Sequence, residues 1–414
     1  MPHAAMTDRA PLAVDVVGRW QALSIIAVAV VLSLTTWFSA TAVTPELTVA
    51  WHLSSTSVAW LTNAVQLGFV AGALLASLVN LPDIVRLNRL MAASAAFAGL
   101  ANAGLLLEPG AGGAIVFRLL TGVALAAVYP PAMKLVATWF IRNRGLALGT
   151  VIGALSLGSA LPHLFRAIGQ TFPWQAVVGA TSLMAFAAAL VFLAMVREGP
   201  YPFSKAVFNP RQIGAVFRDR NLLLANIGYF GHMWELYAMW AWLLTFLRAS
   251  FSVSGGSINP SVLTFLVVAA GIPGCILAGQ FADRVGRTLT TTVLMLISGS
   301  CALLACLFFD GPTWLLVTIV LIWGLTIVAD SAQFSAAITE LANPSFVGTA
   351  LSVQMGLGFG LTVIAIWLMP ILADVLGSWR WVFLSLVPGP LIGAWAMMAL
   401  RRRPEAFRLS NGNR

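Results

Sequence analysis

Residues 20–43, WQALSIIAVAVVLSLTTWFSATAV, form a run of 24 residues without a charged side chain. A helix needs about 20 mainly apolar residues to cross the roughly 30 Å hydrocarbon core of a bilayer. This run is too long for the apolar core of a signal peptide, and many similar runs follow it. We therefore expect residues 20–43 to be retained as the first of several membrane-spanning helices.

Eleven further apolar runs follow, separated by polar residues, glycine or proline. The sequence thus predicts an all-α membrane protein with twelve spans, at 20–43, 58–79, 90–107, 114–137, 146–168, 175–196, 222–247, 262–281, 291–309, 314–337, 347–372 and 381–400.

Composition excludes a soluble protein. Hydrophobic residues make up 59% of the chain and charged residues only 9%, whereas soluble domains carry about 25% charged residues. The three cysteines lie inside apolar runs and give neither a disulfide framework nor a metal-binding spacing. We expect neither a metal nor a cofactor.

The basic residues predict the orientation. Of 23 lysines and arginines, only Arg166, Arg248 and Arg380 fall on the outer side if the amino terminus is cytoplasmic, and Arg118 and Lys134 fall inside the fourth run. Cytoplasmic loops carry an excess of lysine and arginine. We expect a bacterial inner-membrane protein with both termini cytoplasmic, so the net charge of +9 reflects the lipid bilayer as partner and not a nucleic acid.

The two halves of the chain repeat each other at an offset of about 200 residues. Residues 83–89 recur as 283–287, Gly149-Thr150 as Gly348-Thr349, and Trp174 as Trp379. A parallel duplication of six helices is typical of transporters whose halves rock about a central site. It predicts a six-helix bundle at 1–196, a cytoplasmic linker at 197–220, a second bundle at 221–400 and a cytoplasmic tail at 401–414.

Residues 279–287, GQFADRVGR, follow the pattern Gly-x-x-x-Asp-Arg-x-Gly-Arg. They resemble the signature loop of the major facilitator superfamily between spans eight and nine. The resemblance implies two six-helix bundles, transport by alternating access, and a cytoplasmic latch formed by Asp283, Arg284 and Arg287 together with Asp83, Arg86 and Arg89. The alternative is that these arginines only enforce the topology.

Residues 118–122, RLLTG, resemble the Arg-x-x-x-Gly motif of the same superfamily. This implies a role for Arg118 in proton coupling or in contact between helices. The antiporter motif of span five, a Gly-Pro pair followed by Gly-Gly, does not appear in 153–162, GALSLGSALP. A loose similarity to anion carriers rests on Trp139-Phe140 and Arg144-Gly145.

In this superfamily spans one, four, seven and ten line the central cavity, which indicates the candidate transport residues. His232 and Glu235 lie three apart in span seven and share a helical face. A carboxylate inside a membrane is costly unless it is paired, hydrated or protonated, so Glu235 is the first candidate for proton coupling or substrate contact. The alternative is a structural pair with His232.

Span ten offers Asp330 and Gln333, although Asp330 could instead tie that span to a neighbour such as Lys134. In span four, Arg118 and Tyr129 share a face at 100° per residue while Lys134 points to the opposite side, which favours Tyr129 as a cavity residue. The remaining candidates are Trp37 and Thr41 in span one and Trp240 in span seven.

Two functions remain open. The first is a monomeric, proton-coupled secondary transporter that carries a small solute such as an organic or inorganic anion. The second is a proton-driven efflux antiporter for an amphipathic compound. An enzyme would need clustered catalytic groups, whereas the four histidines are scattered through different segments, so we do not expect one.

Overall fold

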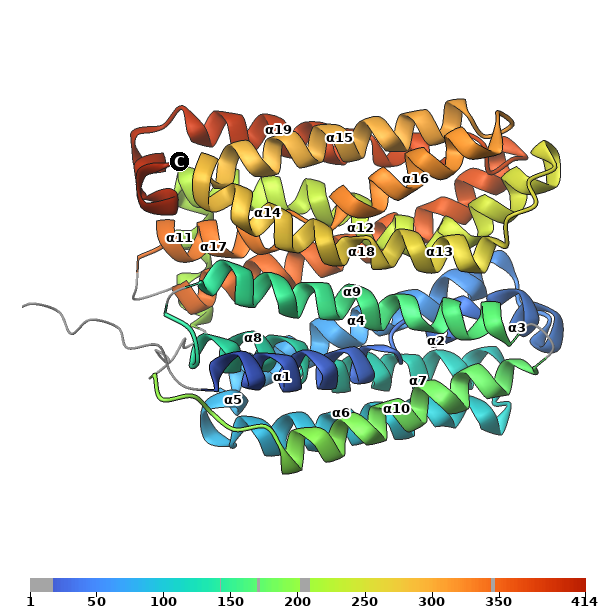
Figure 1. The fold of residues 1–414 in the computed structure, drawn as a ribbon, viewed down its shortest axis with the longest axis horizontal. Coiled ribbons are helices and arrows are strands. Elements are labelled where there is room, and N and C mark those ends of the chain that lie inside the picture. The colour runs from blue at the N-terminus through green and yellow to red at the C-terminus, as the bar shows by residue number, and fades with distance from the viewer. Residues whose placement is uncertain (1–17, 142, 170–171, 202–208, 344–346) are drawn as a thin grey trace, which may run out of the picture.

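The computed structural model describes residues 18–414 except 142, 170–171, 202–208 and 344–346. Arg9, Arg142 and Lys205, three of the basic residues that the predicted orientation places on the cytoplasmic side, lie outside the described residues. Every regular element in the described part of the chain is a helix (Figure 1).

The helices form two groups that lie one above the other in Figure 1. The first half comprises α1 (Arg19–Leu34), α2 (Ser39–Ala42), α3 (Thr44–Trp51), α4 (Ser55–Leu78), α5 (Leu81–Ile84), α6 (Leu87–Ala103), η1 (Gly104–Leu107), α7 (Gly110–Leu125), α8 (Tyr129–Ala137), α9 (Arg144–Ile168) and α10 (Trp174–Ala194).

The second half begins within the predicted linker. It comprises η2 (Pro210–Gln212), α11 (Ile213–Arg218), α12 (Arg220–Ser254), α13 (Pro260–Ala269), α14 (Gly271–Val285), α15 (Arg287–Leu307), α16 (Thr313–Ile327), α17 (Ser331–Leu341), α18 (Val347–Leu376), η3 (Val382–Leu386), α19 (Pro388–Arg401) and η4 (Pro404–Gly412).

The predicted fold class is confirmed. Within the described ranges, eleven helical segments are long and apolar enough to cross a membrane, and the shorter apolar helix α1 accompanies them. The first predicted span is not one continuous helix, however, because residues 35–38 separate α1 from α2.

Spans four and ten are interrupted at corresponding places. Span four breaks at 126–128, between α7 and α8, and span ten at 328–330, between α16 and α17. Pro130 and Pro131 at the start of α8 have no backbone N–H to continue a helix. A break inside the hydrocarbon core frees backbone groups that only the protein can satisfy, so each break needs polar partners from neighbouring helices.

Glycines bring the same pairs of helices into backbone contact in both halves. A Cβ added at Gly68 would lie 2.0 Å from the Leu119 carbonyl oxygen, and one at Gly274 would lie 2.0 Å from the Leu325 carbonyl oxygen. No side chain fits at such distances, so α4 packs on α7 and α14 on α16 with nothing between their backbones. The repeat is therefore visible in helix packing as well as in sequence.

Candidate functional site

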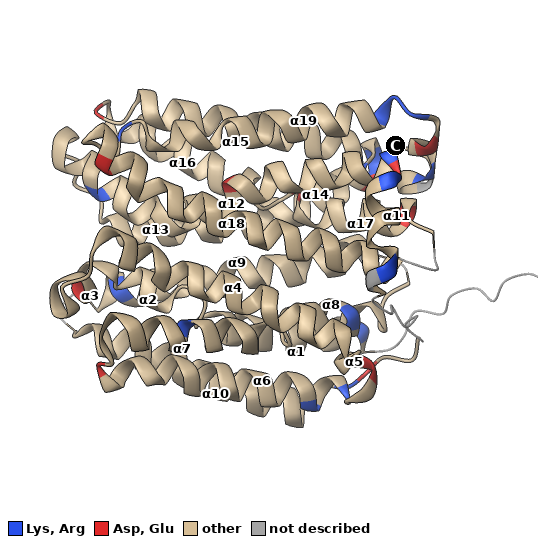
Figure 2. Ribbon diagram, turned by 180° about the vertical axis from the view of Figure 1, so that it is seen from behind, with Lys and Arg blue, Asp and Glu red and all other residues tan. Residues whose placement is uncertain are grey.

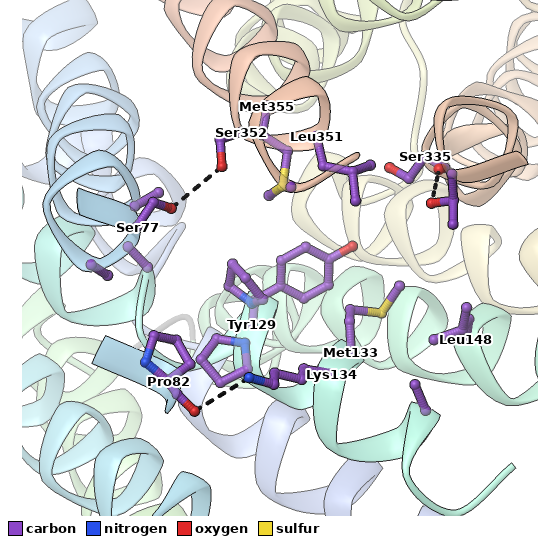
Figure 3. A pocket seen from close by; sticks show the side chains of 18 of the residues that line it. Ser77, Pro82, Tyr129, Met133, Lys134, Leu148, Ser335, Leu351, Ser352 and Met355 are labelled. Carbon is purple, nitrogen blue, oxygen red and sulfur yellow. Dashed lines mark hydrogen bonds between the residues drawn. The ribbon is translucent and has the colours of Figure 1, made fainter. Parts of the chain in front are cut away.

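A cavity of about 720 Å³ lies between the two halves, and all four tyrosines of the chain line it. Tyr129 comes from α8, Tyr229 and Tyr237 from α12, and Tyr201 from the segment that follows α10. Most other lining residues are apolar, including three methionines, of which Met133 and Met355 are labelled in Figure 3. Methionine adapts its shape readily, so the wall suits varied apolar ligands.

The mouth of the cavity carries its only charged side chains among the described residues. Asp83 of α5 and Lys134 of α8 form an ion pair there. The hydroxyl groups of Ser77 on α4 and Ser352 on α18 lie 3.5 Å apart across the two halves (Figure 3). Ile141, which also lines the cavity, is 56% exposed, so the cavity opens at this end.

Six aromatic side chains close the opposite end of the cavity. We call this group the aromatic plug; its members are Trp37, Phe38, Phe69, Tyr237, Trp240 and Phe359. The ring centroids of Phe69 and Phe359 lie 4.5 Å apart, and those of Trp37 and Tyr237 lie 5.8 Å apart. Both pairs join the first half to the second, so the plug seals the cavity by contact between the halves.

The prediction that span one lines the cavity does not match the structure. Trp37 and Trp240 belong to the plug, and the Thr41 hydroxyl lies 2.8 Å from that of Thr62, beyond the plug. Among the described residues span one contributes nothing to the cavity wall, whereas α4, α9 and α18 do. The break at 35–38 accounts for this difference, because it contains Trp37 and Phe38, whose side chains pack in the plug at the closed end of the cavity.

Arg118 holds that break in place. Its side chain is fully buried, and it donates hydrogen bonds to the carbonyl oxygens of Thr36 (2.7 Å), Leu61 (3.2 Å) and Trp37. Further donation reaches Ser39 and Asn102. The guanidinium group therefore supplies the partners that freed carbonyls require inside a membrane.

The expected division of span four into two faces is wrong. α7 ends at Leu125 and α8 begins at Tyr129, so a single helical rotation does not relate Arg118 to the residues after the break. Tyr129 and Lys134 both line the cavity, while Arg118 does not.

Two neighbouring polar groups lie behind the cavity wall. His232 Nδ1 lies 2.9 Å from Asp330 Oδ1, and both side chains are 2% exposed. His232 Nε2 lies 2.7 Å from the hydroxyl oxygen of Ser331, which does line the cavity. Glu235 instead accepts a 2.7 Å hydrogen bond from the Trp323 indole.

These pairings differ from the expected ones. His232 pairs with Asp330 and not with Glu235, and Lys134 pairs with Asp83 and not with Asp330. Glu235 does not line the cavity among the described residues. Sequence spacing identified the residues of span seven correctly as neighbours on one face, but their partners come from span ten, whose position only the tertiary structure defines.

The signature loop joins helices within the second half. Arg287 donates to Gln333 Oε1 at 2.7 Å and to Glu340 Oε2 at 2.9 Å. η4 adds to this cluster, because the Ser410 amide donates to Glu340 at 3.0 Å and the Ser410 hydroxyl to the Ala282 carbonyl at 3.0 Å. Glu340 was not among the predicted residues.

Asp283 is the latch residue that faces the other half. A Cβ added at Gly145, in the first turn of α9, would lie 3.4 Å from Asp283 Oδ2. A carboxylate at a helix N-terminus interacts favourably with the helix dipole. Within the described part of the chain, Arg86, Arg89 and Arg284 form no ion pair, so the predicted latch reduces to Asp283 between the halves and to pairs inside each half.

Comparison with known proteins gives one family and several relatives. The model of the Major Facilitator Superfamily matches residues 25–360. The MFS-type transporter pytF of Aspergillus terreus is 27% identical over 177 residues, which cover 41% of this chain and 56% of pytF. The agnestins efflux protein AgnL12 of Paecilomyces divaricatus is 28% identical over 292 residues, which cover 65% of this chain and 60% of AgnL12.

The chain thus spans less than two thirds of the length of these fungal relatives, and their origin gives no support to the predicted bacterial inner membrane. Among solved structures, a crystal structure of the nucleoside transporter NupG resembles this one with a TM-score of 0.69 at 15% identity. The match covers 92% of this chain and 99% of the other.

Proposed function

Because the chain belongs to the major facilitator superfamily and is a multi-pass transporter rather than an enzyme, we propose that it moves a small, mostly apolar organic solute by alternating access. One observation carries this proposal: a single apolar cavity between the two halves collects all four tyrosines of the chain. Ligand pockets typically measure about 300–1,000 Å³, and 720 Å³ falls within that range.

The cavity favours a neutral, amphipathic solute, as in the second alternative, over an anion. An anion that leaves water needs a positive partner to offset its desolvation. The described lining residues offer only Lys134, which already pairs with Asp83 at the mouth. Tyrosine rings and hydroxyls suit a neutral aromatic solute with a few polar atoms. The resemblance to a protein named for agnestins efflux supports the same choice.

The orientation follows from charge. Lysine and arginine gather at the end of the molecule that carries α5, α8 and η4 (Figure 2), where the cavity opens. Because basic residues accumulate on the cytoplasmic side, we infer that this end is cytoplasmic and that the structure represents the inward-facing state. Separation of the aromatic plug and closure of the mouth would then give the outward-facing state.

Proton coupling is assigned to the buried polar groups of spans seven and ten. Ionisable residues inside membrane spans usually serve transport, and Glu235, His232 and Asp330 are each 2% exposed. Their position behind the cavity wall supports a role in which proton binding changes how the wall receives the solute.

The test is proton flux in proteoliposomes that enclose a pH-sensitive dye. Neutral aromatic compounds should dissipate an imposed proton gradient in the wild type, while organic acids and inorganic anions should not. Glu235→Gln should abolish the coupled flux, and Asp374→Asn, a matched change at an exposed carboxylate near the end of α18, should not. A response to anions alone would show that the proposed solute class is wrong. Solute uptake without proton movement would rule out proton coupling.

A further inference from the structure

Ser331 is the only residue in the described structure that both lines the cavity and contacts His232 directly through a side-chain hydrogen bond. It stands at the first position of α17, directly after the break in span ten, and Asp330 precedes it. The three side chains form a chain from the carboxylate through the imidazole to a hydroxyl on the cavity wall.

The carboxylate determines which ring nitrogen carries hydrogen. Nδ1 lies 2.9 Å from Asp330 Oδ1, but the geometry is not that of a hydrogen bond, and Oδ1 has no hydrogen-bond partner in the described structure. A lone pair on Nδ1 would repel the carboxylate, so the neutral ring carries its hydrogen on Nδ1. Nε2 then has the lone pair and accepts the hydroxyl hydrogen of Ser331, which leaves the oxygen lone pairs of Ser331 for the cavity.

Protonation reverses this arrangement. When a proton binds Nε2, both ring nitrogens are donors, and Nε2–H donates to Ser331 Oγ. The Ser331 hydroxyl hydrogen must then rotate away from the ring, towards the cavity. The serine thereby changes from an acceptor to a donor for any molecule in the cavity, and no covalent bond other than N–H is made.

We propose that Ser331 is the polar anchor for a carbonyl or ether oxygen of the solute, and that a proton on His232 switches this anchor on. The inference rests on the proposed function and specifies its solute: a neutral aromatic compound with a hydrogen-bond acceptor. Because coupling between two ligands is reciprocal, a bound acceptor oxygen strengthens proton binding by the same factor as the proton strengthens solute binding.

Few other titratable groups face His232. On α12 itself, Glu235 lies three residues further on, and the Tyr229 ring centroid is 6.1 Å from the imidazole centroid. Cys275 of α14 lies 3.6 Å from the Val328 carbonyl oxygen, beside Asp330. α13, α16 and η3 contain no titratable residue. The titratable groups of the other elements packed on α12 are Arg218 of α11, Glu340 of α17, Asp374 of α18 and Arg401 of α19, and Glu340 is bound to Arg287.

Benzophenone is a suitable probe because it is neutral, aromatic and only an acceptor, and because long-wave ultraviolet light attaches it to nearby residues. The purified full-length protein would be labelled at increasing benzophenone concentrations, and labelling of the cavity peptides measured by mass spectrometry. One hydrogen bond gained should tighten benzophenone binding about threefold to tenfold when the labelling pH is lowered from about 8 to about 5.

The variants separate the anchor from the rest of the wall. Ser331→Ala and His232→Gln should each bind benzophenone equally at both pH values, whereas Ser331→Thr should restore the pH dependence. Ser335→Ala is the matched control, because Ser335 lines the cavity one turn along α17 and its hydroxyl contacts Gln354 and not His232. It should behave as the wild type.

Two failures are distinguishable. Cavity labelling that ignores pH in the wild type, or a pH dependence that survives Ser331→Ala, would overturn the serine switch and leave the proposed function standing. If benzophenone labels no cavity peptide at any pH in a protein that still elutes as a single species, the proposed solute class is wrong, and the switch falls with it.

Discussion

Replacement of Arg118 by methionine tests the account of the break in span one. Hydrogen bonds to charged groups contribute about 1.5–3 kcal/mol each, and Arg118 gives three of them to main-chain carbonyls. Removal of a charge from the membrane interior returns about 2.5–3.5 kcal/mol. The variant should therefore lose about 1–6.5 kcal/mol of stability by these values, which for a chain of 414 residues corresponds to roughly 1–7 °C in the melting midpoint.

The assay is the temperature at which the purified protein loses its monodisperse peak in size-exclusion chromatography after brief heating. Arg118→Lys keeps the charge but has one donor group with three hydrogens, so it should fall between wild type and Arg118→Met. Because Trp37 follows the Thr36 carbonyl that Arg118 binds, transport should fall with stability. If Arg118→Met is as stable and as active in transport as the wild type, the guanidinium group is not needed as a hydrogen-bond partner for the backbone at the break in span one.

Three further outcomes are expected. Gly274→Val should push α14 away from the Leu325 carbonyl, which lies 2.0 Å from the added Cβ, and expose the buried Cys275 to a thiol dye at lower temperature; Gly360→Ala, which meets nothing within 4 Å, should not. Phe359→Ala should weaken the plug, so that Ser335→Cys, on the cavity side of the plug, becomes reactive to a membrane-impermeant thiol reagent added from outside; no rise in labelling would argue against closure by the plug. Asp83→Asn and Lys134→Met should each reduce transport by removing the ion pair at the mouth, and the double variant should recover part of the loss; additive losses would contradict the pairing.

The fold could be predicted from sequence because its cause is local. A run of about 20 apolar residues must cross the bilayer as a helix whatever its neighbours are, and the 200-residue repeat gives the two halves. Hydropathy does not reveal the breaks at 35–38, 126–128 and 328–330, because each break is only three or four residues long. Even with Thr35, Thr36 and Asp330 among them, these residues hardly lower the average hydropathy of a whole span. The faces assigned to Arg118, Tyr129 and Lys134 assumed an unbroken helix and failed for that reason.

The site was predicted only in part. Placing a carboxylate or histidine inside a membrane span costs free energy, so such residues are conspicuous in the sequence. This is why Glu235, His232 and Asp330 could be predicted as functional candidates. Their partners, Trp323 and Ser331, are common types in apolar or small-residue stretches, and their role depends on contacts between spans seven and ten. A signal was available for the cavity wall: Ser331, Ser335 and Thr339 recur every four residues along α17, a polar stripe that marks one helical face.

The location of all four tyrosines at one cavity has a spectroscopic consequence. If the protein is produced with fluorine-labelled tyrosine, its ¹⁹F NMR spectrum should contain four resonances, and each should come from the cavity wall. No engineered label and no subtraction of signals from elsewhere in the chain would be needed. The four lines would follow solute entry, and the Tyr237 line, whose ring also packs against Trp37, would report separately on the opening of the far side.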